Sequence, residues 1–293
     1  MSKNTAKSIL IIILILLLGL FVALAGSQGG YSVGRIPVYA LAIGLAFSIQ
    51  WIVFIHAYIN KTEMYFDLTG SITYITVMIV SVVLSPEKDL RSWLMLGMVS
   101  VWALRLGTYL FQRIKKEGED RRFREIKKSF PRFLQTWTLQ GLWVTFSLAA
   151  ALVVVTSQKR VPFDVFVVIG ILVWIFGFGM EAIADRQKSL FRQDPENKGR
   201  FIQSGLWYWS RHPNYFGEIV LWIGVMIVAL PVLKGWNWVA LISPVFITIL
   251  MTQISGIPML EKRADEKWGG QKDYENYKVS TSLLLPLPPR KVQ

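Results

Sequence analysis

The sequence predicts an all-α membrane protein, a polytopic helix bundle with seven core spans plus an N-terminal hydrophobic helix. Of the 293 residues, 53% are hydrophobic, which is typical of a membrane protein. Eight apolar runs of 17 to 22 residues are each close to the roughly 20 residues that cross a bilayer as a helix. The runs are Ile9–Ala25, Val38–Ile59, Leu68–Leu84, Ser92–Phe111, Trp137–Thr156, Phe163–Met180, Tyr215–Leu233 and Trp238–Met259. The segments between them are too short to bury a core of their own.

The distribution of Lys and Arg predicts the orientation of these spans. With eight spans, 25 of the 32 basic residues fall on the side that holds the N-terminus, 6 fall on the other side, and Arg105 lies within a span. Cytoplasmic loops carry the excess of Lys and Arg in membrane proteins. We therefore expect the N-terminus, the basic loops and the C-terminus to face the cytoplasm, with the chain in a bacterial inner membrane.

The first run predicts either a signal anchor or a signal peptide. Ala23-Leu24-Ala25 resembles a signal-peptidase site, but an apolar core of 17 residues is longer than most signal peptides and favours retention. We accordingly divide the chain into an N-terminal hydrophobic helix at 1–25 and a membrane-embedded domain at 26–293.

Composition excludes several kinds of site. The chain has no cysteine, which excludes disulfides, thiolate metal sites and a cysteine nucleophile, and its two histidines exclude a multi-histidine metal centre. The Gly177-Phe178-Gly179 run lacks the third glycine of a dinucleotide-binding fingerprint and falls within a predicted span. No metal and no nucleic-acid partner are predicted; membrane lipids are the expected surroundings.

Two charged residues stand at or within spans of the first half. Asp67 opens the third span, where the helix dipole favours a carboxylate, and a functional role is the alternative. Arg105 lies inside the fourth span, six residues before its end, so it either marks a polar pathway or extends to the membrane surface. The basic loop 113–132 that follows predicts an amphipathic helix on the membrane surface, with an anionic-ligand site as the alternative.

The segment from Glu181 to Glu218 is the richest in candidate site residues. It carries six Lys and Arg between two spans, and Pro213 suits the first turn of a helix directed back into the membrane. Asn214 and Glu218 are four residues apart, so they share a helix face, and so do Glu181 and Asp185. A carboxylate one turn into an apolar run predicts a polar cavity. The C-terminal part predicts a charged helix, a break at Gly269-Gly270, and an apolar tail that folds back on the bilayer surface or the bundle.

Several runs carry a resemblance to a known family. They are W-A-L-R-L-G-T-Y, G-E-D-R-R-F, A-D-R-Q-K, G-R-F-I-Q-S-G-L-W, S-R-H-P-N-Y-F-G-E and the closing Y-x-x-Y with a Leu-Pro end. Over about residues 60–288 the sequence resembles the steroid 5-alpha-reductase superfamily, most of all its bacterial branch of unknown function. It is also similar to isoprenylcysteine carboxyl methyltransferases and phospholipid N-methyltransferases, which share the architecture.

The resemblance implies a cytoplasmic-side cavity that holds NADPH, formed by a cofactor-binding half at about 92–293. Arg105, Asp185, Arg192, Asn214 and Glu218 match the family's cofactor contacts. The expected cofactor-binding set is completed by Arg211, His212 and Tyr274. The Gln-Glu pair that handles the substrate carbonyl in the steroid reductases is not found here. Asp67 and Tyr74, which lies two turns further along, are the candidate catalytic residues.

Three functions remain open from the sequence. The first is an NADPH-dependent reductase of a carbon–carbon double bond conjugated to a carbonyl, in a steroid-like or other lipid-soluble substrate, which would place the protein in lipid metabolism. The second is a methyltransferase using S-adenosylmethionine, although Glu261-Lys262-Arg263 stands where those enzymes carry adjacent glutamates. The third is a non-enzymatic lipid-binding or transport protein, which predicts no nucleotide binding at all.

Overall fold

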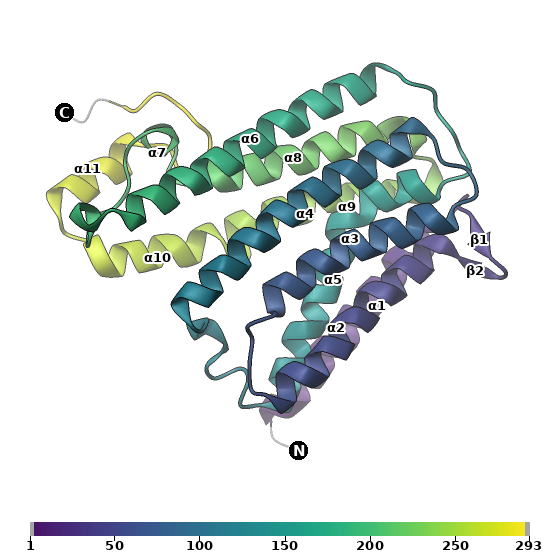
Figure 1. Cartoon of the computed structure of the whole chain (residues 1–293), viewed down its shortest axis with the longest axis horizontal. Helices are drawn as coiled ribbons and strands as arrows, with labels where there is room; N and C mark the ends of the chain where they lie inside the picture. The colour runs from purple at the N-terminus through teal and green to yellow at the C-terminus, as the bar shows by residue number, and fades with distance from the viewer. Residues whose placement is uncertain (1–2, 291–293) are drawn as a thin grey trace. The chain divides into compact units, whose positions relative to one another are not determined.

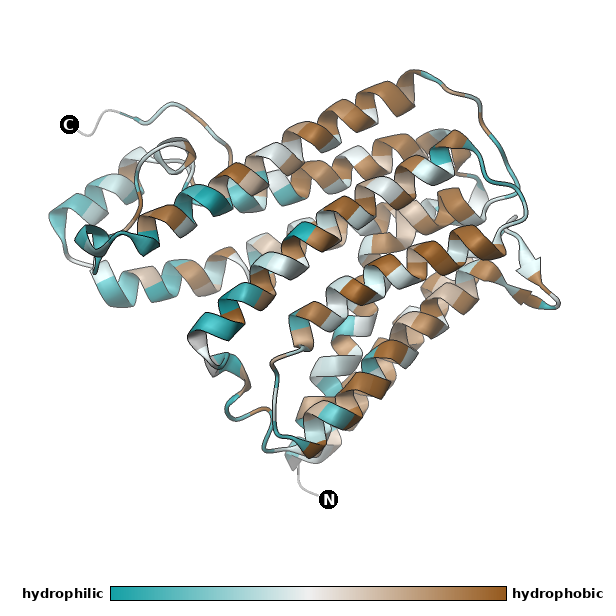
Figure 2. Cartoon of the chain, in the orientation of Figure 1, coloured by the Kyte–Doolittle hydropathy of each residue, from teal (hydrophilic) through white to brown (hydrophobic). Residues whose placement is uncertain are grey.

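The computed structural model describes residues 3–290 and is almost entirely helical (Figure 1). Within those residues, eight helical segments are long and apolar enough to cross a membrane. Figure 2 shows hydrophobic residues along most of α1, α2 and α3, and hydrophilic residues along α10 and α11. The prediction of an all-α polytopic bundle is thereby confirmed. The chain forms two compact units, residues 1–167 with 228–243 (unit 1) and residues 168–227 with 244–293 (unit 2).

Unit 1 is a bundle built around one long helix. Its elements are α1 (Lys3–Gly26), β1 (Ser32–Val33), β2 (Ile36–Pro37), α2 (Val38–Ile59), α3 (Phe66–Leu84), α4 (Leu90–Glu117), η1 (Arg121–Phe123), α5 (Phe130–Thr156), η3 (Leu230–Val232) and η4 (Gly235–Leu241). The two short strands form an antiparallel hairpin with Val33 opposite Ile36. Helix α5 contacts α1, α2, α3, α4 and η4, and its side chains from Leu148 to Thr156 are all buried.

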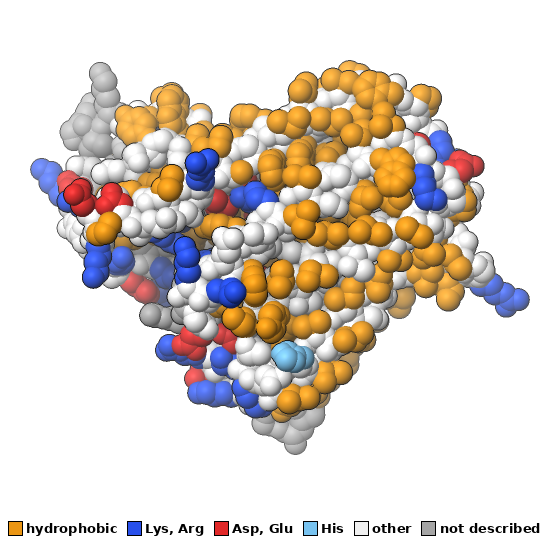
Figure 3. All heavy atoms as spheres, viewed as in Figure 1, with side chains coloured by type: hydrophobic (Ala, Val, Ile, Leu, Met, Phe, Trp, Pro, Cys, Tyr) orange, Lys and Arg blue, Asp and Glu red, His pale blue; other side chains and the backbone are white. Residues whose placement is uncertain are grey.

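The outward faces of unit 1 are hydrophobic. Leu10 on α1, Ile52 on α2 and Val83 on α3 are each about two-thirds exposed. Orange hydrophobic side chains cover much of the visible surface of these helices in the space-filling view (Figure 3). Exposed apolar area of this extent marks a surface that contacts a membrane or another protein, and on helices long enough to span it indicates contact with lipid.

A buried arginine connects several chain segments at one end of unit 1. The Arg91 side chain, at the start of α4, is only 2% exposed. Its guanidinium donates to the carbonyl oxygens of Val228 at 2.5 Å and Pro162 at 3.2 Å, and forms an ion pair with Asp164 at 3.0 Å. Asp164 also accepts from the N–H of Val167 at 3.1 Å. Since a buried charge is tolerated only when it is paired and hydrogen-bonded, this arginine connects three otherwise separate chain segments.

The loop after α4 differs from the predicted surface helix. Helix α4 continues to Glu117 and ends at Gly118, whose φ of 80° suits glycine. The rest of the loop holds only the short turn η1, where Asp120 accepts from the N–H of Arg122 at 3.0 Å. Phe123 is then buried against Phe133 and Trp137. An amphipathic helix over 113–132 was therefore wrong, because a glycine in the left-handed region and a capped turn interrupt it.

Unit 2 contains the segment that the sequence singled out. Its elements are α6 (Val165–Gln193, which enters the unit at Val168), η2 (Pro195–Asn197), α7 (Leu206–Trp209), α8 (Pro213–Ala229, which leaves the unit after Ile227), α9 (Ile242–Ile249, which enters it at Pro244), the π-helical turn η5 (Leu250–Ile254), α10 (Ile257–Trp268) and α11 (Lys272–Ser280). Helices α6 and α8 lie side by side in Figure 1. The break at Gly269-Gly270 separates α10 from α11, as predicted.

Glycines bring α6 and α8 into backbone contact. A Cβ atom on Gly177 would stand 2.4 Å from the Leu221 nitrogen, and one on Gly217 would stand 2.5 Å from the Glu181 nitrogen. One helical turn from the contact of Gly177 with Leu221, a Cβ on Gly224 would lie 2.6 Å from the nitrogen of Trp174. Small residues allow membrane helices to approach this closely. The contact fixes which residues of the two helices face each other.

The C-terminal tail folds onto the segment that precedes α8. The N–H of Arg211 donates to the Ser282 carbonyl at 2.8 Å, and the Ser210 hydroxyl donates to the Leu284 carbonyl at 2.8 Å. The N–H of Leu287 then donates to the carbonyl of Trp209 at 3.1 Å. Of the two alternatives for the tail, the structure shows packing against the protein, where it steadies the start of α8.

The eighth predicted span is not one continuous helix. The structure divides Trp238–Met259 among η4, α9, η5 and α10, with the irregular backbone at Ser255 and Gly256. Pro258 has no N–H to donate to the carbonyl of Ile254, and such a gap interrupts the ladder of a helix. A π-helical turn is one way in which a helix accommodates this. The interruption lies immediately before the part of α10 that faces the site.

Candidate functional site

The candidate site is built at the N-terminus of α8, in unit 2. The Ser210 hydroxyl accepts from the N–H of His212 at 3.1 Å, and the His212 carbonyl accepts from the N–H of Phe216 at 3.1 Å. Pro213 begins the helix at a position where no N–H is needed. His212 and Asn214 therefore flank Pro213 at a helix start that the local hydrogen bonds hold in place.

Asn214 contacts the neighbouring helix. Its side-chain nitrogen donates to Asp185 on α6 at 3.2 Å. Glu181 and Glu218 are both buried, with exposures of 2% and 8%. The close packing of α6 on α8 through glycine explains why Asn214 meets Asp185: Gly217 lies against the backbone of Glu181, so the next turn of each helix is also adjacent.

A second cluster joins the start of α8 to α10. Glu261 accepts from Arg211 through one oxygen and contacts His212 Nε2 through the other, the latter at 2.7 Å. The His212 ring also stacks on Tyr215, with centroids 5.7 Å apart. Burial lowers the pKa of His212, whereas the hydrogen bond from its ring to the Glu261 carboxylate raises it, and the net pKa lies below the ordinary value. The lowered pKa favours the neutral form of the ring.

The tyrosine pair of the C-terminal helix has structural partners. The Tyr274 hydroxyl donates to Asp265 at 2.8 Å, and Lys278 also contacts Asp265 at 2.7 Å. Tyr277 donates to the Trp207 carbonyl at 2.7 Å. Burial is the main cause that raises the pKa of both tyrosines. The two hydroxyls thus fasten α11 to α10 and α7 as neutral donors.

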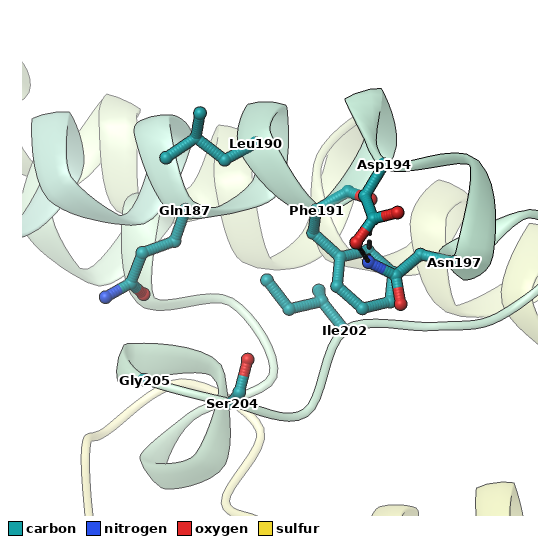
Figure 4. Close-up of a pocket in the computed structure, with 8 residues that line it drawn as sticks. All are labelled: Gln187, Leu190, Phe191, Asp194, Asn197, Ile202, Ser204 and Gly205. Carbon is teal, nitrogen blue, oxygen red and sulfur yellow. Dashed lines mark hydrogen bonds between the residues drawn. The ribbon is translucent and has the colours of Figure 1, made fainter.

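A pocket on α6 lies away from the predicted cofactor residues. It has a volume of about 420 Å³ and is lined by Gln187, Leu190, Phe191, Asp194, Asn197, Ile202, Ser204 and Gly205 (Figure 4). At 100° per residue, Asp185 and Arg192 share one face of α6 and the α6 residues of the pocket lie on the opposite face. Gln187 and Asp194 already accept hydrogen bonds from backbone N–H groups at 2.9 and 3.0 Å. The pocket is a groove of the fold and not the site around Asp185.

The other predicted site residues are spread over the two units. Arg192 is exposed near the end of α6 in unit 2. Arg105 is half-buried on α4 in unit 1. Asp67 lies in the first turn of α3, where its carboxylate is 3.8 Å from Arg113, and Tyr74 is buried with its ring edge-on to Trp102 at 5.0 Å. Asp67 and Tyr74 are seven residues apart, about 10 Å along one helix face.

Two groups of polar residues were not among the predicted site residues. In unit 1, the fully buried Gln50 donates to Thr73 at 2.8 Å, and Gln140 donates to the Phe66 carbonyl at 3.0 Å. Polar side chains within spans mark functional interiors, so their position in apolar runs was the available indication. In unit 2 the contact between Glu261 and His212 was not predicted. The two residues are 49 positions apart, and no sequence pattern connects them at that separation.

Buried polar atoms without a hydrogen-bond partner at the start of α8 test whether a nucleotide would fit there. Among residues 3–290, three buried side-chain atoms there lack a hydrogen-bond partner: His212 Nδ1, Asn214 Oδ1 and Arg211 Nε. Buried polar groups are normally satisfied. Ribose hydroxyls and a carboxamide offer both donors and acceptors to such atoms. The residues present therefore fit the sugar or amide part of a nucleotide cofactor.

Comparison with known proteins places the chain in a family. The family model described as "Protein of unknown function (DUF1295)" matches residues 53–281, which is most of the chain. The chain belongs to this family. The DUF1295 protein is also similar to the steroid 5-alpha-reductase DET2 of Arabidopsis thaliana, with 31% identity over 121 residues. That similarity covers 41% of this chain and 40% of the relative, so the chain matches less than half of the relative's length. No solved structure matches it.

Proposed function

We propose that this DUF1295 protein is an integral membrane reductase that uses NADPH. Its substrate is a steroid-like or other lipid-soluble molecule, in which it reduces a carbon–carbon double bond conjugated to a carbonyl. The distant similarity to a steroid 5-alpha-reductase suggests a membrane reductase. The observation that carries the cofactor assignment is the α8 start, where His212 and Asn214 keep buried atoms free to bind a polar ligand.

In this proposal the chain's residues divide between the two ends of the cofactor. His212, Asn214 and Asp185 bind hydroxyl and amide groups, and Glu218 lines the same helix start. Arginine matches the shape and charge of phosphate, and Arg192 on α6 is the proposed phosphate partner within unit 2. NADPH would supply a hydride to the β-carbon of the double bond.

The proposed acid is on α3. Reduction of a conjugated double bond places negative charge on the carbonyl oxygen, and a positioned hydrogen-bond donor stabilises that charge. The Tyr74 hydroxyl and a protonated Asp67 are the two candidates in the described part of α3. Either would hydrogen-bond the oxygen, and the α-carbon of the enolate would then take a proton from that donor or from water, so that one hydride and one proton complete the reduction. The cofactor site and the C-terminus are proposed to face the cytoplasm, on the basis of the excess of basic residues on that side.

One observation favours a second function. Glu181, Asp185 and Glu218 place three acidic side chains on the facing parts of α6 and α8, while Arg211 is already paired with Glu261. Such an acidic surrounding is better suited to a cation than to phosphates. S-adenosylmethionine carries a cationic sulfonium, so a membrane methyltransferase is the alternative.

Ligand-dependent stability separates the two functions. Detergent-purified protein is heated with NADPH, NADH or S-adenosylmethionine, and the melting temperature is recorded from tryptophan fluorescence. Stabilisation follows RT ln(1 + [L]/Kd), about 2.7 kcal/mol at a hundredfold excess over Kd. We expect NADPH to stabilise the protein and S-adenosylmethionine to leave it unchanged. Stabilisation by S-adenosylmethionine alone would favour the methyltransferase.

Matched variants connect that result to the site. Asn214→Ala removes the amide that contacts Asp185 and should reduce the NADPH effect. Leu190→Ala, on the opposite face of α6 in the pocket of Figure 4, should leave it intact. Equal effects of the two variants would remove Asn214 from the proposed cofactor site.

A further inference from the structure

Glu261 uses its two oxygens for two different partners. Oε2 accepts from the Arg211 guanidinium, and Oε1 lies 2.7 Å from His212 Nε2. An ionised carboxylate can only accept hydrogen bonds, and arginine can only donate them. The contact between Glu261 and His212 is therefore a hydrogen bond only if His212 carries a proton on Nε2.

We infer that Glu261 is a positioning residue that holds His212 in its Nε2–H tautomer, so that Nδ1 remains a bare acceptor for a hydrogen-bond donor of the ligand. The two ring nitrogens of a neutral histidine are distinct, and the partner of one sets the role of the other. Nδ1 is buried and has no hydrogen-bond partner within residues 3–290. This inference rests on the proposed function for the identity of the ligand, but not for the role of Glu261.

Burial supports the neutral ring that this tautomer requires. A doubly protonated histidine would donate from both nitrogens. Burial lowers the pKa of His212, and Arg211 and Lys188 lower it further, while Glu261 opposes them. Asn214 shows the same arrangement two residues later: Nδ2 is directed to the carboxylate of Asp185, and Oδ1 is a buried acceptor without a partner in the described residues.

The two acceptors define the chemistry of the group they would bind. Each flanks Pro213, and each is set by a carboxylate on another helix, Glu261 on α10 and Asp185 on α6. Hydroxyl and amide N–H groups donate hydrogen bonds, whereas fully ionised phosphate oxygens only accept them. We therefore assign the His212 and Asn214 acceptors to a ribose hydroxyl or a carboxamide N–H₂ and not to a phosphate, while the Arg211 Nε–H donor is left for an acceptor atom of the ligand.

The tautomer can be measured without any ligand. The chain contains two histidines, His56 and His212, so a His56→Gln protein labelled with ¹⁵N-histidine gives the resonances of one ring. Protonated and bare ring nitrogens have well-separated ¹⁵N shifts. We expect a bare Nδ1 and a protonated Nε2 at pH 7.5. A protonated Nδ1 in this protein would overturn the inference, with no further variant required.

Glu261→Gln should reverse the tautomer. The amide oxygen would remain with Arg211, which can only donate, so the amide N–H₂ would face His212 and require a bare Nε2. The proton then moves to Nδ1. Asp265→Asn is the matched control, because Asp265 lies on the same helix but contacts Tyr274 and Lys278. An unchanged tautomer in Glu261→Gln would show that Glu261 does not position the ring.

Ligand affinity tests the second half of the inference. NADPH binding to the same proteins is measured by titration calorimetry. We expect Glu261→Gln to weaken binding about tenfold or more, since His212 Nδ1 changes from an acceptor to a donor that faces a donor of the ligand. Asp265→Asn should leave the affinity unchanged. Reversal of the tautomer with unaltered affinity would refute the donor-binding role. No binding to the wild-type protein would instead count against the proposed cofactor, while the NMR result still decides the role of Glu261.

Discussion

Two glycines that are two residues apart on α6 should respond oppositely to the same substitution. A Cβ on Gly177 would lie 2.4 Å from the Leu221 nitrogen and 2.7 Å from the Gly217 oxygen, both backbone atoms of α8. A Cβ on Gly179 would meet nothing within 4 Å. Ordinary contacts of a methyl carbon with such atoms are about 3.5 Å or longer. Gly177→Ala therefore requires the two helices to separate, whereas Gly179→Ala requires no movement.

The expected magnitudes follow from two opposing effects. Alanine is favoured over glycine in a helix by about 0.5–1 kcal/mol. Overpacking a close contact costs about 1–3 kcal/mol, and backbone atoms cannot rotate out of the way as a side chain can. We expect Gly179→Ala to be neutral or stabilising by up to about 1 kcal/mol. Gly177→Ala should lower the free energy of unfolding by about 1–2 kcal/mol, because the helix gain offsets part of the clash.

The assay is reversible unfolding in mixed detergent micelles, followed by tryptophan fluorescence. NADPH binding by the same samples gives a second measurement, because separation of α6 from α8 should also weaken the contact between Asn214 and Asp185. Equal stability of the Gly177→Ala and Gly179→Ala proteins would refute the assignment of the glycine contact.

Three further predictions follow from other parts of the chain. Arg91→Met should lower the free energy of unfolding by about 3–5 kcal/mol, since it removes the buried cation from its partners; Arg35→Met at an exposed position should change it by less than about 0.5 kcal/mol. His212 has a lowered pKa in the folded protein, so the unfolded chain binds the proton first and stability should fall as the pH drops below about 6.5, in a titration that His212→Gln abolishes. Cysteines introduced at Arg122 and Lys272 should resist an impermeant thiol reagent in intact cells, and ready labelling would contradict the cytoplasmic orientation.

Hydropathy located the spans well but not their ends. The fourth and sixth runs were expected to end at Phe111 and Met180, whereas α4 continues to Glu117 and α6 to Gln193. A helix that leaves the hydrocarbon region continues until its backbone hydrogen bonds are interrupted or a cap ends it. A hydropathy profile contains neither kind of information. The glycine that ends α4, Gly118, reports the true boundary through its positive φ.

The candidate site was predictable where it depends on helix periodicity. The spacing of four placed Asn214 and Glu218 on one face of α8, and Glu181 and Asp185 on one face of α6. The contact between Asn214 and Asp185 also requires the register of α6 against α8. That register depends on Gly177 and Gly217. In the sequence, Gly177 stood out only as part of a run that lacks a complete dinucleotide-binding fingerprint, and Gly217 did not stand out at all.

The contact of Glu261 with His212 could not have been predicted from periodicity. The π-helical turn Leu250–Ile254 precedes α10, and each residue added to a helical turn rotates the faces that follow by about 100°. The interruption at Ser255 and Gly256 changes the direction of α10 further. A helix drawn straight through the eighth apolar run would therefore place Glu261 on an arbitrary face. Irregular backbone at this point is what decides which carboxylate faces His212, and with it which nitrogen of that ring remains an acceptor.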